Sequence, residues 1–432
     1  MLLEFSVRNF RSFRDEHTFS LVASQGKEHW NTHTAALPGD DDRRGLRSAV
    51  VYGPNASGKT NLLLALNAMK EVVVKSAVAG QRGDAIQPID PFRLTKEHRS
   101  ASTAFEVNFI TDGVEYQYGF EATREQVIEE WLYAYPKGQA RRWFTRTYNA
   151  NHENGAFNPG DYLKGQRKQI WEATRPNALF LSTAVQLNNE QLAPIFDWFR
   201  SVAYLPGRRL GSAYTAEACE DEEQKQRILA LLSAADVGIR DMFLEEEPVD
   251  FDQLPAGLVD VIAETGKKDQ VEKALSRAIR FQHTEEADED GLLDLEEESH
   301  GTQQLFGLAG PILDVLDDGR VLLVDEIDAS LHPKMVEEVV SLFNDPATNP
   351  HGAQLLFNTH DVTLLNQDLL RRDQIWITEK FDDGASQLTP LLDFKPRKKT
   401  EALDKNYLEG RYGGLPLPRM KQKAEMIAHE TR

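Results

Sequence analysis

The sequence of 432 residues contains a single cysteine, Cys219. One cysteine cannot form an internal disulfide framework or a cysteine-based zinc site, and it fits a reducing compartment. We expect Cys219 to be a buried bystander rather than a nucleophile, because no histidine lies near it in the sequence. No stretch approaches 18 consecutive apolar residues, so no membrane-spanning helix is predicted. The first residues lack the basic start and long apolar run of a signal peptide, and we expect a cytoplasmic protein.

Positive charge is also scarce. The chain has 49 Lys and Arg against 69 Asp and Glu, a formal net charge of −20. Attraction of the whole surface to nucleic acid is therefore not expected, and nucleic-acid binding by the chain alone would be weak and would need a local basic patch. Three clusters are candidates, with a solvated surface cluster as the alternative for each: 141–143 with Arg146; Lys164, Arg167 and Lys168; and 395–399.

Residues 53–60 read Gly-x-x-x-x-Gly-Lys-Thr, the pattern of a phosphate-binding loop in nucleoside triphosphatases. Residues 48–52 before it predict a buried strand, and residues 61–66 after it predict a helix. The glycines let several backbone N–H groups converge on one anion, and the helix adds its positive end. The nucleotide-binding residues are thus predicted to be Gly53, Pro54, Asn55, Ala56, Ser57, Gly58, Lys59 and Thr60.

Two of these residues have predicted roles beyond the loop backbone. Lys59 would pair with the β- and γ-phosphates of ATP, and Thr60 would offer its hydroxyl to Mg²⁺. A glycine-rich turn that matches the pattern by chance is the alternative interpretation.

The second motif is the apolar run 321–324 followed by Asp325 and Glu326. It predicts a buried strand with two carboxylates at its carboxyl end, where an open α/β sheet places its ligand chemistry. Asp325 would hold Mg²⁺ in its second shell, and Glu326 would be the general base that orients and deprotonates the attacking water. An acidic turn after a core strand is the alternative.

Three weaker signals accompany these motifs. Residues 354–358 predict another buried strand, and His360 follows it; we expect His360 to contact the γ-phosphate, although a histidine after a strand is often structural. Ser299 and Gly301 open a predicted helix and form a potential anion-binding cap, although ordinary helix caps look the same. Asp328 belongs to the segment that follows the paired carboxylates.

The first third of the chain predicts an antiparallel sheet. Residues 2–7 and 19–22 suggest an opening pair of strands, whereas 32–45 reads as a polar loop. The alternating runs 105–110 and 115–120 flank an Asp-Gly turn, which is a strong hairpin signal. Further strands of the same sheet are predicted at 127–135 and 142–148, helical structure at 162–202, and helical or mixed structure at 222–232 and 258–279.

These patterns divide the chain into four predicted segments. They are an N-terminal ATPase lobe, an insertion that begins as strands and becomes helical, a C-terminal ATPase lobe and a tail: 1–120, 121–290, 291–395 and 396–432. The acidic run 285–290 near the end of the insertion is expected to be a solvated loop rather than a metal site.

Taken together, the motifs resemble the ATP-binding-cassette type of P-loop ATPase, the group that includes SMC and RecF proteins. In that group the order is Walker A, signature, Walker B, D-loop and His switch, and here it reads 53–60, 299–304, 321–326, 328–332 and His360. The signature reads Ser-x-Gly-Thr-x-Gln and departs from the Leu-Ser-Gly-Gly-Gln of transporters.

This signature, with residues 9–13, 330–333 and 407–416, resembles the RloA and AbiL abortive-infection family of bacterial AAA ATPases. The overcoming-lysogenization-defect nucleases and the ATPase subunits of the Septu and PARIS systems are more distant relatives. The resemblance covers nearly the whole chain. It implies an α/β fold, an ABC-type P-loop ATPase head with a mixed central sheet, an antiparallel β subdomain and a mostly helical insertion.

The resemblance also implies a homo-oligomer in which two heads face each other head to tail. ATP held by Lys59 and Thr60 of one head would be closed over by Ser299 and Gly301 of the other, with Asp328 beside it. ATP binding would then favour association of the heads, and hydrolysis would favour their release.

Three further residues follow only from the resemblance. Gln87 is the candidate for the family's Q-loop glutamine, and Arg11 and Phe13 are candidates for contact with the base or phosphates of the nucleotide.

Two absences bear on function. Residues 121–298 lack the sustained heptads of a coiled coil, so tethering of distant DNA is not expected. Residues after His360 show no compact acidic array of a metal-dependent nuclease. We therefore expect an ATP-hydrolysing sensor or regulator in an anti-phage defence system, acting on a separate effector such as a nuclease. The alternative is an SMC- or RecF-like ATPase that acts directly on DNA in repair or chromosome maintenance.

Overall fold

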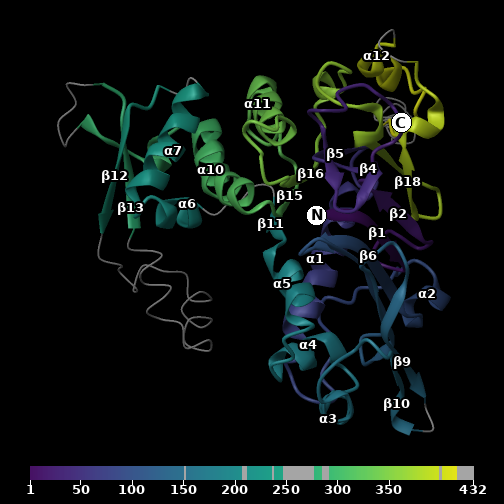
Figure 1. The fold of residues 1–432 in the computed structure, drawn as a ribbon. Coiled ribbons are helices and arrows are strands. Elements are labelled where there is room, and N and C mark those ends of the chain that lie inside the picture. Colours follow the sequence, from purple (N-terminus) through teal and green to yellow (C-terminus); the bar gives the residue numbers. More distant parts are fainter. Residues whose placement is uncertain are drawn as a thin grey trace, which may run out of the picture. The chain divides into compact units, whose positions relative to one another are not determined.

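The described residues of the computed structural model form two compact units (Figure 1). The described ranges are 1–149, 152–206, 212–235, 238–246, 277–284, 291–397 and 401–415. The first unit comprises Leu2–Arg200 and the chain from Asn358 onward, and we call it the loop unit. The second comprises Ser201–Phe357 together with Met1, and we call it the carboxylate unit. The loop unit is thus discontinuous in sequence.

A seven-stranded sheet dominates the loop unit, and every strand pair in it is antiparallel. Its strand order is β10-β9-β8-β7-β6-β1-β2. The strands are β1 (Leu2–Arg8), β2 (His17–Ser20), β6 (Thr103–Thr111), β7 (Val114–Ala122), β8 (Val127–Tyr135), β9 (Arg141–Asn149) and β10 (His152–Pro159). The predicted opening pair and the two further strands are confirmed.

The predicted hairpin between β6 and β7 is also confirmed. Its turn has Asp112 at φ 49° and Gly113 at φ 72°. Two consecutive residues with positive φ are the requirement of a type I′ turn, whose twist matches that of the flanking strands. The Asp-Gly pair therefore determines the hairpin register locally.

The prediction of a polar loop at 32–45 is wrong, because β3 (Thr34–Leu37) and β4 (Asp40–Leu46) form an antiparallel hairpin there. The charged side chains of β4 obscured its strand pattern. Arg43 pairs with Asp40 and also with Glu115 of β7, with N–O distances of 2.6 Å for both. The hairpin is thus held partly by an ion pair with a distant strand, which local hydrophobic patterning does not report.

The phosphate loop lies between β5 (Ser48–Tyr52), which is buried throughout, and α1 (Lys59–Lys75), as predicted. β5 pairs in parallel with β17 (Ile375–Lys380), and β17 pairs antiparallel with β18 (Ser386–Pro390). The remaining helices of this unit are α2 (Lys96–Ser100), α3 (Arg167–Ala173), α4 (Phe180–Gln186), α5 (Ala193–Ser201), η4 (Val362–Leu364), η5 (Arg372–Gln374), η6 (Leu391–Phe394) and α12 (Leu403–Leu408).

Arg146, a candidate for a basic surface patch, is instead a core residue and is only 4% exposed. Its guanidinium donates to Glu130 at 3.3 Å and to the carbonyl oxygen of Ala178 at 2.8 Å. Glu130 also accepts hydrogen bonds from the backbone N–H groups of Phe180 and Leu181 at the start of α4. Arg146 thus neutralises a buried carboxylate that ties α4 to the sheet, and both the patch and the surface-cluster interpretations are wrong for it.

The carboxylate unit contains three parallel strands and a group of packed helices (Figure 1). The parallel strands are β11 (Ala203–Leu205), β15 (Val321–Val324) and β16 (Gln354–Asn358). Among the described residues of this unit, the α-helices are α6 (Ser212–Ala218), α7 (Glu222–Ala234), α10 (His300–Asp318) and α11 (Pro333–Asn344). A small sheet of β12 (Asp241–Glu246), β13 (Arg277–Gln282) and β14 (Leu293–Asp294) is followed by η3 (Leu295–Glu297).

Helix α10 carries Pro311 in its interior, where proline removes one hydrogen bond of the helix. The carbonyl oxygen of Gly307 loses its usual donor there, and the Thr215 hydroxyl of α6 lies 3.5 Å from it. The same hydroxyl accepts from the N–H of Gly310 at 3.2 Å. A side chain at Gly310 would collide with Thr215, so the two helices approach closely where the proline interrupts the ladder.

No helix in the described part of the chain is long and apolar enough to cross a membrane. The predicted acidic loop 285–290, most of the predicted segment 258–279 and most of the tail lie outside the described residues, as does part of the basic cluster 395–399. The four predicted segments remain a prediction.

Candidate nucleotide-binding site

The phosphate loop needs glycine at two positions for steric reasons. Gly53 has φ 150° and Gly58 has φ 115°, both in a region that L side chains rarely adopt. A Cβ at Gly53 would collide with Thr378 of β17, and one at Gly58 would collide with Ser386 of β18. The loop backbone can therefore curl only if these positions carry no side chain.

Lys59 is buried at the first position of α1 and is 6% exposed. Its Nζ donates to the carbonyl oxygens of Gly53 at 2.8 Å and Pro54 at 3.2 Å. The ammonium is thus held across the mouth of the loop, and Thr60 follows on the first turn of the helix. A fixed cation and a helix N-terminus at one place suit an anion such as a phosphate group.

Hydroxyl groups from distant segments support the loop, and sequence reasoning missed them. Ser386 Oγ lies 2.5 Å from the carbonyl oxygen of Ser57 and 2.8 Å from Ser12 Oγ. Asn61 of α1 donates to Ser12 Oγ at 2.8 Å. Ser57 Oγ lies 2.6 Å from Thr378 Oγ1, which donates to the carbonyl oxygen of Tyr52. The loop is therefore held from both the N-terminal turn and the β17–β18 hairpin.

The N-terminal turn places Arg11 and Phe13 differently. Phe13 is 0% exposed and packs edge-on against His17, so the expectation that it contacts a nucleotide is wrong. Arg11 is exposed, has φ 49°, and its Nε lies 3.4 Å from Asp90. Ser12 between them lies beside the phosphate loop, since a Cβ at Gly58 would be 3.0 Å from its Oγ.

His360 is exposed beside the strand that enters the phosphate loop. The N–H of Thr359 donates to the carbonyl oxygen of Val51 at 3.4 Å, and the Tyr52 hydroxyl donates to the carbonyl oxygen of Asp361 at 3.0 Å. Both sequence neighbours of His360 are therefore hydrogen-bonded to β5. Gln87 lies exposed in the irregular segment after α1, and its predicted role remains a prediction.

The paired carboxylates follow β15 in the carboxylate unit, as predicted. The N–H of Asp325 donates to the carbonyl oxygen of Leu205 at 3.1 Å, which extends the pairing with β11. Glu326 has φ 51°, which is uncommon for a residue with a side chain. The chain therefore turns away from the direction of the buried strand at Glu326. Both carboxylates are partly exposed.

Ser299 caps α10, as predicted: its Oγ accepts a hydrogen bond from the N–H of Thr302 at 3.2 Å. A Cβ at Gly301 would lie 3.0 Å from the carbonyl oxygen of Ser330, so the signature-like segment runs beside the segment that contains Asp328. A pocket of about 540 Å³ lies between them, lined by Ser212, Leu295, Glu296, His300, Gln303, Gln304, Ala329 and Ser330.

The predicted site residues thus fall into two groups. Lys59, Thr60 and His360 belong to the loop unit, with the rest of the phosphate loop. The carboxylate unit holds the other group, namely Ser299, Gly301, Asp325, Glu326 and Asp328.

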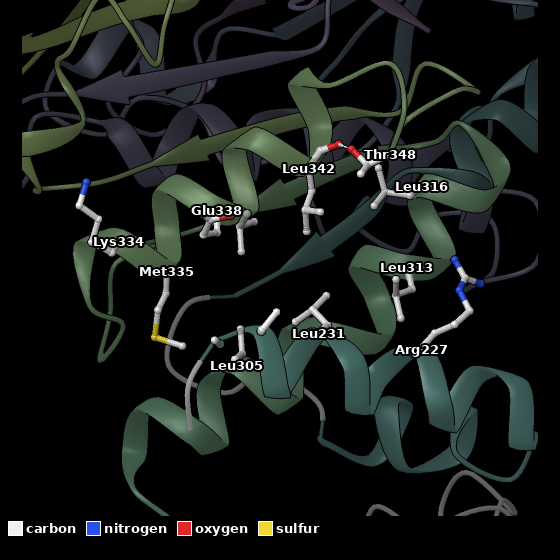
Figure 2. A pocket seen from close by; sticks show the side chains of 13 residues that line it. Arg227, Leu231, Leu305, Leu313, Leu316, Lys334, Met335, Glu338, Leu342 and Thr348 are labelled. Carbon is white, nitrogen blue, oxygen red and sulfur yellow. Dashed lines mark hydrogen bonds between the residues drawn. The ribbon is translucent and has the colours of Figure 1, made fainter. Parts of the chain in front are cut away.

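A second pocket in the carboxylate unit, of about 530 Å³, is walled by apolar side chains of α7, α10 and α11 (Figure 2). Figure 2 shows Leu231, Leu305 and Met335 on its walls. The cations on its rim are already paired, since Arg227 binds Asp317 at 2.7 Å and Lys334 binds Glu337 at 2.6 Å. We therefore do not expect phosphate binding there.

A buried strand, a phosphate loop and a helix, with paired carboxylates after another buried parallel strand, define the class of P-loop ATPase domains. Residues 48–366 match the family model described as "AAA domain, putative AbiEii toxin, Type IV TA system". The chain belongs to this family. The match begins at the first residue of β5 and ends after His360, so it includes the phosphate loop, the paired carboxylates, the Ser299 cap and His360, but not Arg11 and Phe13.

No curated protein matches the chain. Many solved structures are similar to it, among them the following three. An SMC head domain from Thermotoga maritima is 15% identical, with 90% of this chain and 98% of that chain covered and a TM-score of 0.39. An SMC head bound to the C-winged helix domain of ScpA is 13% identical, with 90% and 96% covered and a TM-score of 0.42. A dimeric ATP-binding cassette bound to ADP and phosphate is 11% identical, with 90% and 98% covered and a TM-score of 0.31.

Proposed function

We propose that this chain binds ATP with Mg²⁺ at residues 53–60 and hydrolyses it to ADP and phosphate. The observation that carries the proposal is the buried Lys59 ammonium, held across a glycine loop at the N-terminus of α1. A cation, converging N–H groups and a helix dipole together favour a polyphosphate over a neutral ligand.

The other site residues receive roles in this proposal. Thr60 and Asp325 supply a hydroxyl and a carboxylate, which are the hard oxygen donors that Mg²⁺ prefers. Bound Mg²⁺ would neutralise charge that develops on the phosphates. Glu326 would orient and deprotonate the attacking water, and His360 would contact the γ-phosphate.

The direct test is hydrolysis of ATP by the purified chain, measured as released phosphate with and without Mg²⁺. Lys59→Ala should weaken ATP binding, because it removes the cation at the loop. An equal rate and an equal affinity in the parent and Lys59→Ala would contradict the proposal.

We further propose that two copies associate head to tail around ATP. Ser299 and Gly301 of one copy would close over the nucleotide held by Lys59 and Thr60 of the other, with Asp328 next to them. The cap geometry of Ser299 and the pocket beside Gly301 support this role, since a helix N-terminus favours an anion.

The biological proposal is an ATPase subunit of a bacterial abortive-infection defence system, of the RloA and AbiL type and active in the cytoplasm. It would sense or regulate a separate effector, such as a nuclease. The family description names a putative toxin of a type IV toxin–antitoxin system, which supports a role in growth control or defence. The alternative remains an ATPase that acts directly on DNA; the net charge of −20 argues against it.

Identification of the effector tests the biological proposal. The Glu326→Gln variant, purified in the presence of ATP, should form a complex with the product of an adjacent gene. The Lys59→Ala variant should not form this complex. Tight, salt-resistant binding of the chain alone to duplex DNA would favour the alternative.

A further inference from the structure

Two buried hydroxyl groups connect the phosphate loop with β17, the strand next to β5. Ser57 Oγ lies 2.6 Å from Thr378 Oγ1, and Thr378 Oγ1 lies 3.1 Å from the carbonyl oxygen of Tyr52. Ser57 is 1% exposed and Thr378 is 0% exposed, so water does not compete for these bonds. Tyr52 ends β5 before the loop, whereas Ser57 lies near the end of the loop, next to Gly58. Thr378 therefore bridges the two ends of the loop.

The direction of both hydrogen bonds follows from the number of hydrogens available. A carbonyl oxygen can only accept, and a threonine hydroxyl carries one hydrogen. The hydrogen of Thr378 is therefore used on Tyr52, and the Ser57 hydroxyl must donate to Thr378 Oγ1. The side chain of Ser57 then has no hydrogen left to donate to a phosphate oxygen.

Two further contacts of the β17–β18 hairpin fix the same part of the loop. Ser386 Oγ of β18 donates to the carbonyl oxygen of Ser57 at 2.5 Å. Thr378 also limits the space beside the first glycine of the loop, since a Cβ at Gly53 would lie 2.4 Å from Thr378 Oγ1. Ser57 is thus held at its side chain by β17 and at its carbonyl oxygen by β18.

We propose that Thr378 is a positioning residue of the phosphate loop, whose hydroxyl ties Ser57 to the end of β5 and keeps the loop closed around the phosphates of a nucleotide, and that the Ser57 side chain supports binding only through this bond. This role rests on the proposed ATP binding at residues 53–60. A loop that already has its binding conformation loses less conformational entropy when the ligand binds, so the two hydrogen bonds of Thr378 increase the affinity.

Thr378→Val tests the role, because valine has nearly the shape of threonine and lacks the hydroxyl. Thr378→Ser is the conservative variant, which keeps the hydroxyl and loses only a methyl group. The matched control is Thr103→Val on β6. Thr103 is also 0% exposed, and its hydroxyl donates to the carbonyl oxygen of Asn9 at 2.7 Å. Neither Thr103 nor Asn9 belongs to the phosphate loop.

We expect Thr378→Val to raise the KM and the Kd for ATP with Mg²⁺ by about 3- to 10-fold. The kcat at saturating ATP should change less, since no group at the reacting atoms is altered, and Thr378→Ser should stay close to the parental values. Thr103→Val should leave the KM unchanged. Both valine variants should lower the melting temperature, because each leaves a buried carbonyl oxygen without its donor. Equal KM values in Thr378→Val and Thr103→Val would overturn the role.

A double variant tests the direction of the Ser57 bond. Ser57→Ala alone should raise the Kd for ATP, because it removes the side of the bridge that belongs to the loop. In the Thr378→Val background it should raise the Kd no further, since the bond that it removes is already lost. A further rise in the double variant would show that the Ser57 hydroxyl binds the phosphates directly, and it would overturn the proposal.

Two additions keep the test decisive. If Thr378→Val does not fold, Thr378→Ala is compared with Thr378→Ser, because these two variants differ only in the hydroxyl group; equal Kd values would overturn the role. Binding of ATP to the parent and to Lys59→Ala is measured in parallel. Absence of binding by the parent overturns the proposed function and this role together, whereas parental affinity in Thr378→Val overturns this role alone.

Discussion

At the scale of single residues, the site depends on backbone conformations that few side chains tolerate. Glu326 takes a positive φ of 51° directly after a strand buried along its whole length. Such a conformation costs free energy, of order 1–3 kcal/mol, and persists where the surroundings enforce it. The strained residue is the predicted general base, so the strained backbone lies at the position of the proposed chemistry.

The first prediction concerns that base. Glu326→Gln should keep ATP binding and slow hydrolysis by roughly 10²–10⁴-fold, because the amide cannot accept the proton of the attacking water. Phosphate release and ATP binding are measured on the same preparation. A variant that hydrolyses ATP at the parental rate would show that another group is the base.

The second prediction concerns Cys219, which is buried, as expected for a bystander. Burial raises the pKa of its thiol to about 11. Only about one molecule in a thousand would carry the thiolate at pH 8, and the thiolate is the reactive form. A chromogenic disulfide reagent should therefore label the folded protein slowly and the urea-unfolded protein rapidly. Fast labelling of the folded protein, both with and without ATP, would contradict this prediction and would show that the thiolate is exposed.

At the scale of elements, short segments are attached to the larger sheet by buried polar groups. Helix α4 has only 7 residues, and its first two N–H groups bind Glu130. Burial raises the pKa of Glu130, and Arg146 opposes this shift. The ion pair thus replaces the water that the carboxylate and the guanidinium lose on folding.

Removal of Arg146 should be costly for this reason. Arg146→Ala leaves the Glu130 carboxylate buried without its cation, and we expect a loss of about 3–5 kcal/mol in the free energy of unfolding. Arg142→Ala is the matched control on the same strand, since Arg142 is exposed, and it should change stability by less than about 0.5 kcal/mol. Urea unfolding measures both, and equal effects would contradict the structural role of Arg146.

The cap of α10 allows a prediction about association. Ser299→Arg places bulk and charge at the helix N-terminus and should block closure of a second copy over ATP. Light scattering of Glu326→Gln with ATP should show a larger species than without nucleotide, and adding Ser299→Arg should abolish the difference. Unchanged hydrolysis in the single variant Ser299→Arg would contradict a role for the cap in trans.

At the scale of the whole molecule, charge and ligand chemistry limit what the chain does alone. The net charge of −20 leaves few surfaces that neutralise phosphates. Within the described ranges, no group of three or more His, Cys, Asp or Glu side chains is arranged to hold a metal ion. A two-metal nuclease site needs several converging acidic ligands.

The purified chain should therefore hydrolyse ATP and leave plasmid, phage DNA and tRNA intact in Mg²⁺ or Mn²⁺. Expression of the chain alone should not be toxic, whereas toxicity should require a second gene product and an intact Lys59. Cleavage that persists in Lys59→Ala would reveal a nuclease site in this chain. Toxicity of the chain alone would instead favour the toxin named in the family description.

Local sequence is enough to predict the elements whose geometry depends on neighbouring residues. The phosphate loop between β5 and α1, the carboxylates after β15, the Ser299 cap and the Asp-Gly hairpin all follow from torsional and hydrogen-bonding rules that act over a few residues. The family match includes the same motifs.

The fold determines which distant groups complete those elements. Ser386 binds the loop from the β17–β18 hairpin, Ser12 binds Ser386 from the N-terminal turn, and Arg146 enters the core. Each of these side chains is polar, and its local sequence is compatible with an exposed position. Burial of such a group is favourable only where a partner from another segment satisfies its hydrogen bonds, and that partner is supplied by the fold rather than by the neighbouring sequence.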